Sequence, residues 1–220
     1  MKKLIALLFT IVCIFALAGC SNDDVFTEKT YSADKTEVES ITVDVEDREL
    51  EIYASYDGKI NIDYFDGEKE YLDISFSESK ELTVKLIYNK NWTDYVGFKP
   101  SADYRKIKIG IPDNLLTSFS ATTTNESISI GALSFTEYLS LKCEGGDVIC
   151  ERVNAGKSVS LKAKNGDITG SIIGGWDDFS ISCKIKNGEC NLPLNKENGE
   201  KKLIAECNNG DIKIEFLKTI

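Results

Sequence analysis

The chain has 220 residues, with 36 Asp and Glu against 26 Lys and Arg, no histidine, and a formal net charge of −10 at pH 7. A chain this acidic is not expected to bind nucleic acid or an anionic membrane surface through electrostatic attraction. The absence of histidine removes the most frequent general base and a common zinc ligand. The sequence also has no P-loop, dinucleotide-binding or nucleophile-elbow motif, so we expect a non-enzymatic protein without a cofactor.

Residues 1–19 predict a secretory signal peptide. Two lysines precede an apolar run over residues 4–17, and small residues come directly before Cys20. The sequence Leu17-Ala18-Gly19-Cys20 resembles the lipobox of bacterial lipoproteins, which implies cleavage before Cys20 and attachment of diacylglycerol to its sulfur. An uncleaved transmembrane anchor is disfavoured because the run is short for a membrane span. We therefore expect the protein at the cell membrane, lipid-anchored on the extracytoplasmic face.

The mature chain comprises residues 20–220, and removal of Lys2 and Lys3 takes the net charge from −10 to −12. Membrane contact should therefore come from the lipid alone. Residues 20–37 are polar and lack periodicity, which predicts a flexible tether. The rest is long enough for one elongated domain. We divide it into an N-terminal β-region, residues 38–110, and a β-repeat region, residues 111–220, continuous with it.

Apolar and polar residues alternate through the N-terminal β-region, and no stretch shows a sustained helical period. Such alternation predicts strands with one buried face and one wet face. The alternating positions lie around Arg48 (Ile41, Val43, Val45, Leu50 and Ile52) and within residues 60–64, 72–76, 82–88 and 107–111.

Residues 88–104 alternate little and are rich in aromatic side chains. Trp92 and Tyr95 are candidate binding residues in this segment, because exposed aromatics often anchor partners. Alternatively, the segment folds over an open end or edge of the β-structure and shields it from aggregation.

The β-repeat region repeats around a Gly-Asp corner. Its corner glycines recur at a nearly constant spacing and each precede Asp or Glu: Gly146, Gly166, Gly188 and Gly210. Glu126, one period before Gly146, begins a degenerate earlier copy, Glu126-Ser127. A period of this size, roughly 20–22 residues, is typical of stacked β-architectures.

Each copy carries mostly apolar or small residues at five positions, namely seven, five and three residues before the corner residue and two and four after it. Polar residues fill most positions between them. Each copy is therefore expected to form two short strands joined at the corner. In the order of the five positions, the residues are Phe119, Leu139, Val159, Ile181 and Leu203; Ala121, Leu141, Leu161, Cys183 and Ala205; Thr123, Cys143, Ala163, Ile185 and Cys207; Ile128, Val148, Ile168, Cys190 and Ile212; and Ile130, Cys150, Gly170, Leu192 and Ile214.

Two all-β architectures fit this pattern. Three corners contain Asn-Gly, a pair that tolerates positive φ and is a strong hairpin signal, so a β-sandwich of antiparallel hairpins is one alternative. We favour a parallel β-solenoid in which each copy is a coil stacked on the one before, because equivalent positions carry equivalent side chains and one corner tolerates Glu126. The length differences all fall on one side, here called the variable side (residues 134–138, 154–158, 174–180 and 196–202).

Five cysteines follow the lipid site, and all fall at inward-facing positions of the repeat: Cys143, Cys150, Cys183, Cys190 and Cys207. Free cysteine behaves as a small buried hydrophobe, so we interpret them as core residues. A disulfide between two of them is the alternative, since the expected location is oxidising.

The acidic corner residues Asp147, Asp167, Glu189 and Asp211 would form a column in a stack of coils. Calcium could bind such a column, but each corner offers a single carboxylate where a hard cation prefers six or more oxygens. Aspartate at a turn commonly bonds nearby backbone amides instead. We therefore expect no metal site.

The variable side offers the second set of candidate binding residues. Trp176 and Phe179 lie beside Asp177 and Asp178, and aromatic residues on a surface can anchor an envelope protein or a glycan. The alternative is again a segment that shields an edge.

The run Ile107-Lys-Ile-Gly-Ile-Pro112-Asp-Asn-Leu, the repeated Asn-Gly-Asp-Ile segments and the closing Asn-Gly-Asp-Ile-Lys-Ile resemble the bacterial "putative adhesin" β-strand-repeat family, over roughly residues 38–217. The resemblance implies an all-β repeat domain at the cell envelope, with no catalytic residues to carry over. We expect an adhesin-like binding or scaffolding module. The alternatives are a structural or envelope-stress accessory protein that assembles with envelope proteins and, with less support, a carbohydrate-acting enzyme.

Overall fold

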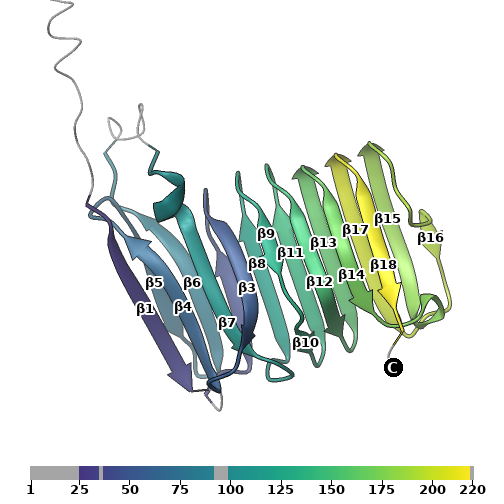
Figure 1. The fold of residues 1–220 in the computed structure, drawn as a ribbon, viewed down its shortest axis with the longest axis horizontal. Helices are drawn as coiled ribbons and strands as arrows, with labels where there is room; N and C mark the ends of the chain where they lie inside the picture. The colour runs from purple at the N-terminus through teal and green to yellow at the C-terminus, as the bar shows by residue number, and fades with distance from the viewer. Residues whose placement is uncertain (1–24, 35–36, 92–98, 219–220) are drawn as a thin grey trace, which may run out of the picture.

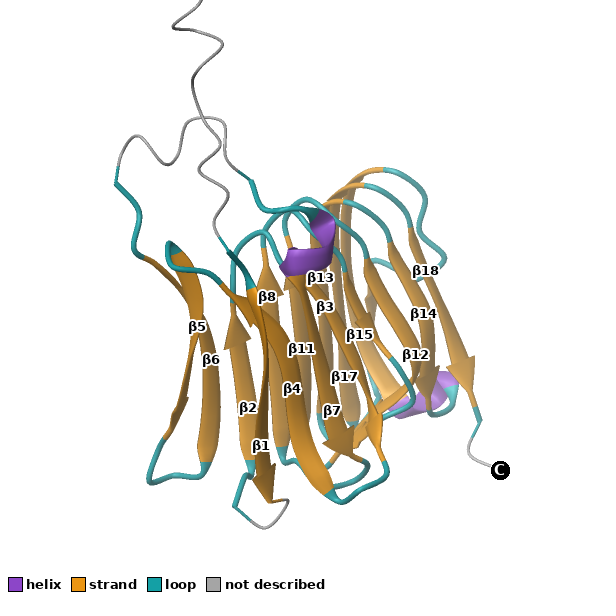
Figure 2. Ribbon diagram, turned by 60° about the vertical axis from the view of Figure 1, so that its left-hand side comes forward, coloured by secondary structure: helices purple, strands orange, loops and turns teal. Residues whose placement is uncertain are grey.

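The computed structural model describes residues 25–34, 37–91 and 99–218. Two sheets face each other, and their strands follow one another along the long axis of the molecule (Figures 1 and 2). The helical elements of the described residues are two short 3-10 helices, η2 (Ala102–Arg105) and η3 (Trp176–Asp178). Within the described ranges, no helix has the length and apolar character needed to cross a bilayer.

Each sheet has nine strands. The first sheet has the order β1 (Thr27–Asp34), β4 (Lys59–Asp66), β7 (Lys106–Pro112), β3 (Glu49–Ser55), β9 (Ile128–Ile130), β12 (Val148–Ala155), β14 (Ile168–Ile173) and β18 (Ile212–Leu217), with β10 (Ser134–Phe135) beside β12. The second has the order β16 (Asn195–Lys196), β15 (Phe179–Asn187), β17 (Lys201–Asn209), β13 (Ser158–Asn165), β11 (Tyr138–Cys143), β8 (Ser118–Thr123), β2 (Ser40–Asp44), β6 (Glu81–Tyr88) and β5 (Glu70–Phe76).

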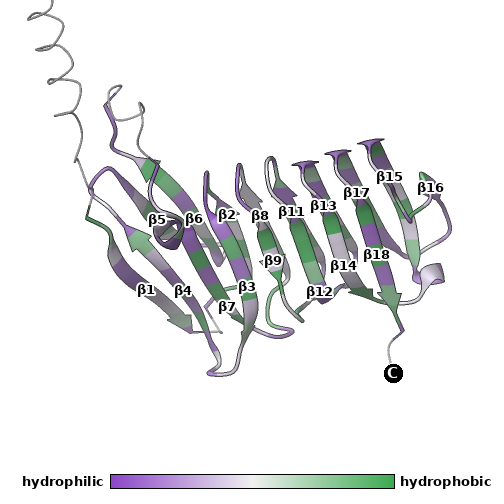
Figure 3. Ribbon diagram, turned by 45° about the horizontal axis from the view of Figure 1, so that its top comes forward, coloured by the Kyte–Doolittle hydropathy of each residue, from purple (hydrophilic) through white to green (hydrophobic). Residues whose placement is uncertain are grey.

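The repeat forms a parallel β-solenoid, as the sequence predicts. In the coils β11–β12, β13–β14 and β17–β18 a strand of the second sheet leads through a Gly-Asp corner into a strand of the first sheet. The β8–β9 coil turns at Glu126-Ser127, and after β15 the chain reaches the first sheet through an isolated bridge from Cys190 to Ile212. Equivalent positions of neighbouring coils pair in register: Leu139 lies between Phe119 and Val159. The inward-facing residues of both sheets are buried in one apolar core, and Figure 3 shows hydrophobic and hydrophilic residues interspersed along the strands. The alternative of a sandwich of antiparallel hairpins is wrong for the repeat.

The stacking order differs from the order along the chain at both ends. The coils β8–β9, β11–β12 and β13–β14 stack in sequence, but β17–β18 lies between the β13–β14 coil and the coil that begins with β15. At the other end, β2–β3 lies inside β6–β7 and pairs directly with β8–β9. The expectation that each coil stacks on the preceding one is therefore wrong at these ends. Strands with interchangeable apolar positions can pair with any neighbour, so the repeat pattern does not specify the order.

The N-terminal end of the stack is closed by antiparallel strands. Strand β5 pairs with β6, β4 pairs with β7, and β1 pairs with β4 over its full length from Thr27 to Asp34. The expectation of a flexible tether is wrong for Thr27–Asp34. Ala33 is buried in the core and Tyr31 packs against it, and the backbone ladder with β4 holds the rest of β1 in place.

The corner glycines are required by close stacking more than by backbone conformation. A Cβ atom on Gly166 would lie 2.2 Å from the carbonyl oxygen of Gly146 in the next coil. Gly210 has φ +148° as well, and its Cβ would lie 2.3 Å from the carbonyl oxygen of Gly166. None of the asparagines before the corners, Asn165, Asn187 and Asn209, adopts a positive φ. Instead their side chains form a ladder, with Asn187 donating to Asn209 and Asn209 to Asn165, each at 2.7 Å.

Candidate functional site

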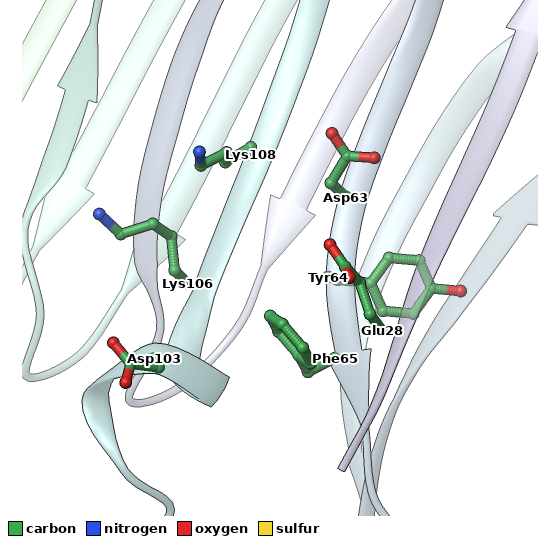
Figure 4. A pocket seen from close by; sticks show the side chains of 7 residues that line it. All are labelled: Glu28, Asp63, Tyr64, Phe65, Asp103, Lys106 and Lys108. Atoms are coloured by element: carbon green, nitrogen blue, oxygen red, sulfur yellow. The ribbon is translucent and has the colours of Figure 1, made fainter.

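A groove opens in the first sheet where strands β4 and β7 separate. The two strands pair only through Asn61, Ile62 and Asp63 of β4, after which β4 follows β1 and β7 follows β3. The helix η2 lies at the point of separation. The groove has a volume of about 380 Å³ and is lined by Glu28, Asp63, Tyr64, Phe65, Asp103, Lys106 and Lys108 (Figure 4).

The two strands that flank the groove carry opposite charges, and Asp103 of η2 adds a carboxylate below the lysines (Figure 4). Lys106 and Lys108 lie on β7, and Asp63 and Phe65 lie opposite them on β4 (Figure 4). The carboxylate of Asp63 accepts a hydrogen bond from the Thr30 hydroxyl at 2.7 Å. Such a groove can offer both donors and acceptors to a polar ligand beside an aromatic surface.

Aromatic residues hold this end of the first sheet together. The ring of Phe65 packs edge-on against Tyr104 of η2 at 5.3 Å between centroids, and Tyr104 stacks on Phe26 at 4.9 Å. Burial raises the pKa of Tyr64, as does the nearby carboxylate of Asp66, so its phenol keeps its proton at neutral pH.

Sequence reasoning missed this groove for a physical reason. Its walls come from β1, β4, η2 and β7, which only the antiparallel additions to the solenoid bring together. Glu28 moreover lies in the segment expected to be a tether. The alternation of apolar and polar residues predicted the strands that contain Asp63 and Lys108. It did not indicate that the two strands separate after this pair of residues.

The second candidate surface lies at the opposite end of the stack, on the variable side. Trp176 of η3 has 44% of its surface exposed, which agrees with the expectation that it is accessible. Its ring packs edge-on against Phe216 at 5.5 Å, and the ammonium group of Lys196 lies 5.6 Å from the ring centroid. Asp177 and Asp178 are exposed, and one carboxylate oxygen of Asp178 accepts the backbone N–H of Gly175 at 2.6 Å.

Phe179 does not share this surface, and the expectation that it could act as an exposed anchor is wrong. Its side chain is 1% exposed and packs against Phe216, with 5.4 Å between the centroids. Phe179 begins strand β15 and alternates with Ile181 and Cys183, so all three point into the core.

Lys196 links Trp176 to a shallow pocket of about 240 Å³ beside it. The pocket is lined by Ser180, Ile181, Ser182, Asn195, Lys196, Glu197, Lys202, Leu203 and Ile204. The ammonium group of Lys196 also donates to the carbonyl of Phe179 at 2.7 Å, which holds the lysine over this end of the coil. We call Trp176, Lys196 and this pocket the terminal surface. It combines one exposed aromatic ring with hydroxyl, amide and charged groups.

Three of the residues predicted from the sequence lie outside the described residues. These are the candidate binding residues Trp92 and Tyr95 and the lipid-attachment residue Cys20, together with the expected signal peptide at residues 1–19.

The acidic corner residues form the predicted column and use it for backbone hydrogen bonds. The Asp147 carboxylate accepts the N–H of Asp167, and the Asp211 carboxylate accepts the N–H of Glu189, at 2.8 and 2.9 Å. Within the described part of the chain, no group of three or more Cys, Asp or Glu side chains is arranged to hold a metal ion. The column therefore acts as a structural ladder between coils.

The five cysteines of the repeat are free thiols in this structure. Cys143, Cys150, Cys183 and Cys207 are buried, as expected of core residues, whereas Cys190 is half-buried. Burial raises the pKa of the Cys150 thiol to about 12. These side chains fill positions that other coils occupy with aliphatic residues.

One solved structure supports this architecture. A crystal structure described as a putative cell adhesion protein from Clostridium sporogenes ATCC 15579 aligns with a TM-score of 0.65 and 12% identity, covering 88% of this chain and all of that one. A putative adhesin from Bacteroides fragilis NCTC 9343 aligns over 90% of this chain and all of its own, with a TM-score of 0.35 and 14% identity. No curated protein matches the sequence. The sequence profile of the Toastrack DUF4097 family matches residues 38–216, and the chain therefore belongs to this family.

Proposed function

We propose that the protein is a lipid-anchored, extracytoplasmic binding module with an adhesin-like, non-enzymatic role, and that it recognises an envelope glycan through its terminal surface. The proposed lipid site, Cys20, precedes the start of β1 at Thr27 by seven residues. Seven residues span at most about 25 Å, so the N-terminal end of the stack stays close to the membrane. Strands β15 and β16 lie at the other end (Figure 1).

The observation that carries the proposal is the exposed Trp176 beside Lys196 at the end of the stack away from the anchor. With a strand spacing of about 4.8 Å, the eight strands from β1 to β18, inclusive, extend roughly 35 Å. A surface at that end can meet a ligand beyond the membrane. An aromatic ring beside hydroxyl, amide and charged groups suits a glycan, which has both apolar faces and hydroxyl groups.

The structural neighbour from Clostridium sporogenes also supports an adhesive role, since it shares the fold over its whole length and is described as a putative cell adhesion protein. At 12% sequence identity, the likeness supports a shared fold but does not identify a shared ligand. Absence of histidine and the structural use of the acidic corners support a non-enzymatic role.

A glycan-binding screen with the soluble protein from residue 21 onward tests the proposal, with isolated envelope fractions as a second arm. The Trp176→Ala variant should lose binding while its β-type circular dichroism spectrum is kept. Tyr138→Ala is the matched control: Tyr138 is 46% exposed on the variable side of a central coil, with the Lys157 ammonium 5.6 Å from its ring. That variant should bind normally.

Loss of binding in both variants, or in neither, would contradict a site at the terminal surface. If the wild-type protein binds no glycan and no envelope fraction, the adhesin role is wrong and the structural accessory role becomes the better explanation. Binding to protein components of the envelope fraction alone would replace the glycan with a protein ligand.

Lipid anchoring has its own test. The full-length chain, expressed in a bacterial host with a labelled fatty acid, should incorporate the label and sediment with membranes. Cys20→Ala should abolish both. Persistence of the label in the variant would show that the lipid is attached elsewhere.

A further inference from the structure

The coil that begins with β15, at the end of the stack away from β1, differs from the others at one pair of inward-facing positions. These positions lie five residues before and two residues after the corner. In the other coils both hold aliphatic residues, as in Leu141 with Val148 and Ala205 with Ile212. In this coil, here called the terminal coil (residues 179–192), they hold Cys183 and Cys190.

The two sulfur atoms of this pair are in contact. The Sγ atoms of Cys183 and Cys190 lie 3.0 Å apart, with the corner Gly188 between the two residues in the chain. The buried thiols beside two other corners contact backbone carbonyl groups instead. The Sγ atom of Cys143 lies 2.8 Å from the carbonyl oxygen of Glu126, and the Sγ atom of Cys207 lies 3.3 Å from that of Gly166.

We propose that Cys183 and Cys190 form a disulfide bond that closes the terminal coil, and that the bond forms by exchange with a protein or small-molecule disulfide. Sulfur atoms 3.0 Å apart need approach by only about 1 Å to reach bonding distance. This inference goes beyond the proposed function, because it holds whatever the terminal surface binds.

The difference in burial gives the order of the exchange. Cys190 is half-buried and can reach an external disulfide, whereas Cys183 is buried. The Cys190 thiolate attacks the reagent and releases one reagent thiolate, which leaves a mixed disulfide on Cys190. The Cys183 thiolate then attacks the Cys190 sulfur and expels the second reagent thiolate. Two protein thiols lose their protons to solvent, two electrons pass to the reagent, and two reagent thiols leave.

Burial also sets the slow step. It raises the pKa of the Cys183 thiol, so less of it is thiolate at neutral pH. The second exchange step is therefore slow at pH 7 and becomes faster as the pH rises.

The bond would join the two parts of the terminal coil that end the stack. Cys183 belongs to β15, whose outer edge carries only the two-residue strand β16 among the described strands. Cys190 bridges to Ile212 of β18, and the next residue, Asn191, donates to the Ile214 carbonyl and accepts its N–H at 2.9 and 3.0 Å. A terminal repeat contacts neighbours on one side only and opens first, so a covalent link here acts as a cap.

The experiment uses the full-length protein extracted in mild detergent and exposed to oxidised glutathione at pH 8. Free thiols are then alkylated and the protein is digested with trypsin without reduction. Cleavage after Lys164, Lys184, Lys186 and Lys196 puts Cys183 and Cys190 on separate peptides. We expect these peptides to be joined by a bond that a reductant breaks, with Cys143, Cys150 and Cys207 alkylated.

Each cysteine is replaced by the residue that another coil carries at the equivalent position, so that the variants are expected to fold. Cys183→Ala and Cys190→Val copy Ala205 and Val148 of other coils, and Cys207→Ala, a control, copies Ala163. Oxidation should raise the midpoint of thermal unfolding by roughly 5 °C in the wild type and in the control, and should leave both cysteine variants unchanged. Separate alkylated or glutathionylated peptides after oxidation of the folded wild type would overturn the proposal, as would a link from Cys190 to Cys207.

Discussion

The carboxylate of Asp167 accepts the backbone N–H of Asp211 at 2.8 Å, although 44 residues separate them in the chain. The same bond recurs along the corner column. The hydroxyl of Ser127 accepts the N–H of Asp147 at 3.0 Å, and the later links reach Glu189. We call these residues the acidic ladder (Ser127, Asp147, Asp167, Asp211 and Glu189). Each link joins two coils, so the ladder follows the spatial order of the stack and not the order of the chain.

Removal of one link of the acidic ladder should destabilise the protein. Asp167→Ala leaves the N–H of Asp211 without its acceptor and should lower the free energy of unfolding by about 1–2 kcal/mol. Asp167→Asn keeps an acceptor oxygen at that position and should lower the free energy of unfolding by a smaller amount. Chemical denaturation monitored by circular dichroism measures both, and an equal loss would show that charge matters and the hydrogen bond does not.

Acid should destabilise the stack through its paired carboxylates. The N–H of Glu189 and the Lys213 ammonium hold the pKa of Asp211 below its ordinary value of 3.8, and the Lys162 ammonium holds that of Glu206 below 4.5. Both groups bind fewer protons in the folded state than in the unfolded state. Their contribution is therefore complete above these ordinary values and is lost as the pH falls through the lowered folded-state pKa.

The melting temperature should accordingly stay level from neutral pH to roughly pH 5 and fall below it. In Glu206→Gln the melting temperature should fall less steeply with pH, in the range between the folded-state pKa of Glu206 and its ordinary value. A variant whose melting curve depends on pH as steeply as the wild type would show that Glu206 makes no such contribution.

A methyl group at a stacked corner should be far more damaging than one at an open glycine. In Gly166→Ala the Cβ would lie 2.2 Å from the Gly146 oxygen, so neighbouring coils must separate, at a cost of at least about 2 kcal/mol. In Gly131→Ala the nearest atom is the Ile52 oxygen at 3.7 Å, an ordinary contact. Thermal unfolding of the two variants compares them, and similar melting temperatures would contradict the close stacking of corners.

A buried ion pair supports the N-terminal end of the stack. Arg48 donates to Glu70 at 2.6 Å, and Lys90 contacts the other carboxylate oxygen. All three side chains are buried. Glu70→Gln removes the buried carboxylate that both cations contact and should cost about 3–5 kcal/mol.

The control for Glu70→Gln is Glu39→Gln, which removes one side of an exposed pair with Lys80 and should change stability by less than about 0.5 kcal/mol. Equilibrium denaturation in urea measures both variants. An equally small loss in Glu70→Gln would mean that the Glu70 carboxylate is not needed to stabilise the two cations.

Trp176 and Phe179, three residues apart, should respond differently to substitution. Phe179→Ala empties a core position and should cost about 3–5 kcal/mol, whereas Trp176→Ala removes a half-exposed ring and should cost less. The measurement is thermal unfolding of each single variant. Only Trp176→Ala is therefore suitable as a binding probe. A stable Phe179→Ala variant would show that the core at this end can collapse around the gap.

Much of the fold could be predicted from alternation and period. Val148, for example, pairs with Ile128 and Ile168 in the register that the repeat predicts. The candidate site was predicted less well. Trp176 is exposed as expected, but Phe179 is buried because η3 ends just before it and the alternation of β15 begins with it.

The polar residues at the corners could not be explained from the sequence. Glu126 stands where other corners have glycine, and Lys99 and Arg105, which lie well before it in the chain, pair with its carboxylate. Arg48 takes the equivalent place one coil away and is buried because Glu70 meets it there. Local pattern gives no information on partners that the chain brings back from a distant strand.

The sequence by itself determined that the chain forms repeated β-coils and which side chains face the core, because burial at alternate positions requires this in any register of stacked coils. Only the tertiary structure decided the order of the coils, the antiparallel closure by β1, β4 and β5, and the groove where β4 leaves β7. The apolar columns are interchangeable, so neighbours are selected by contacts between distant segments. The contact of Cys183 with Cys190 likewise required the folded corner, which brings them together across the coil.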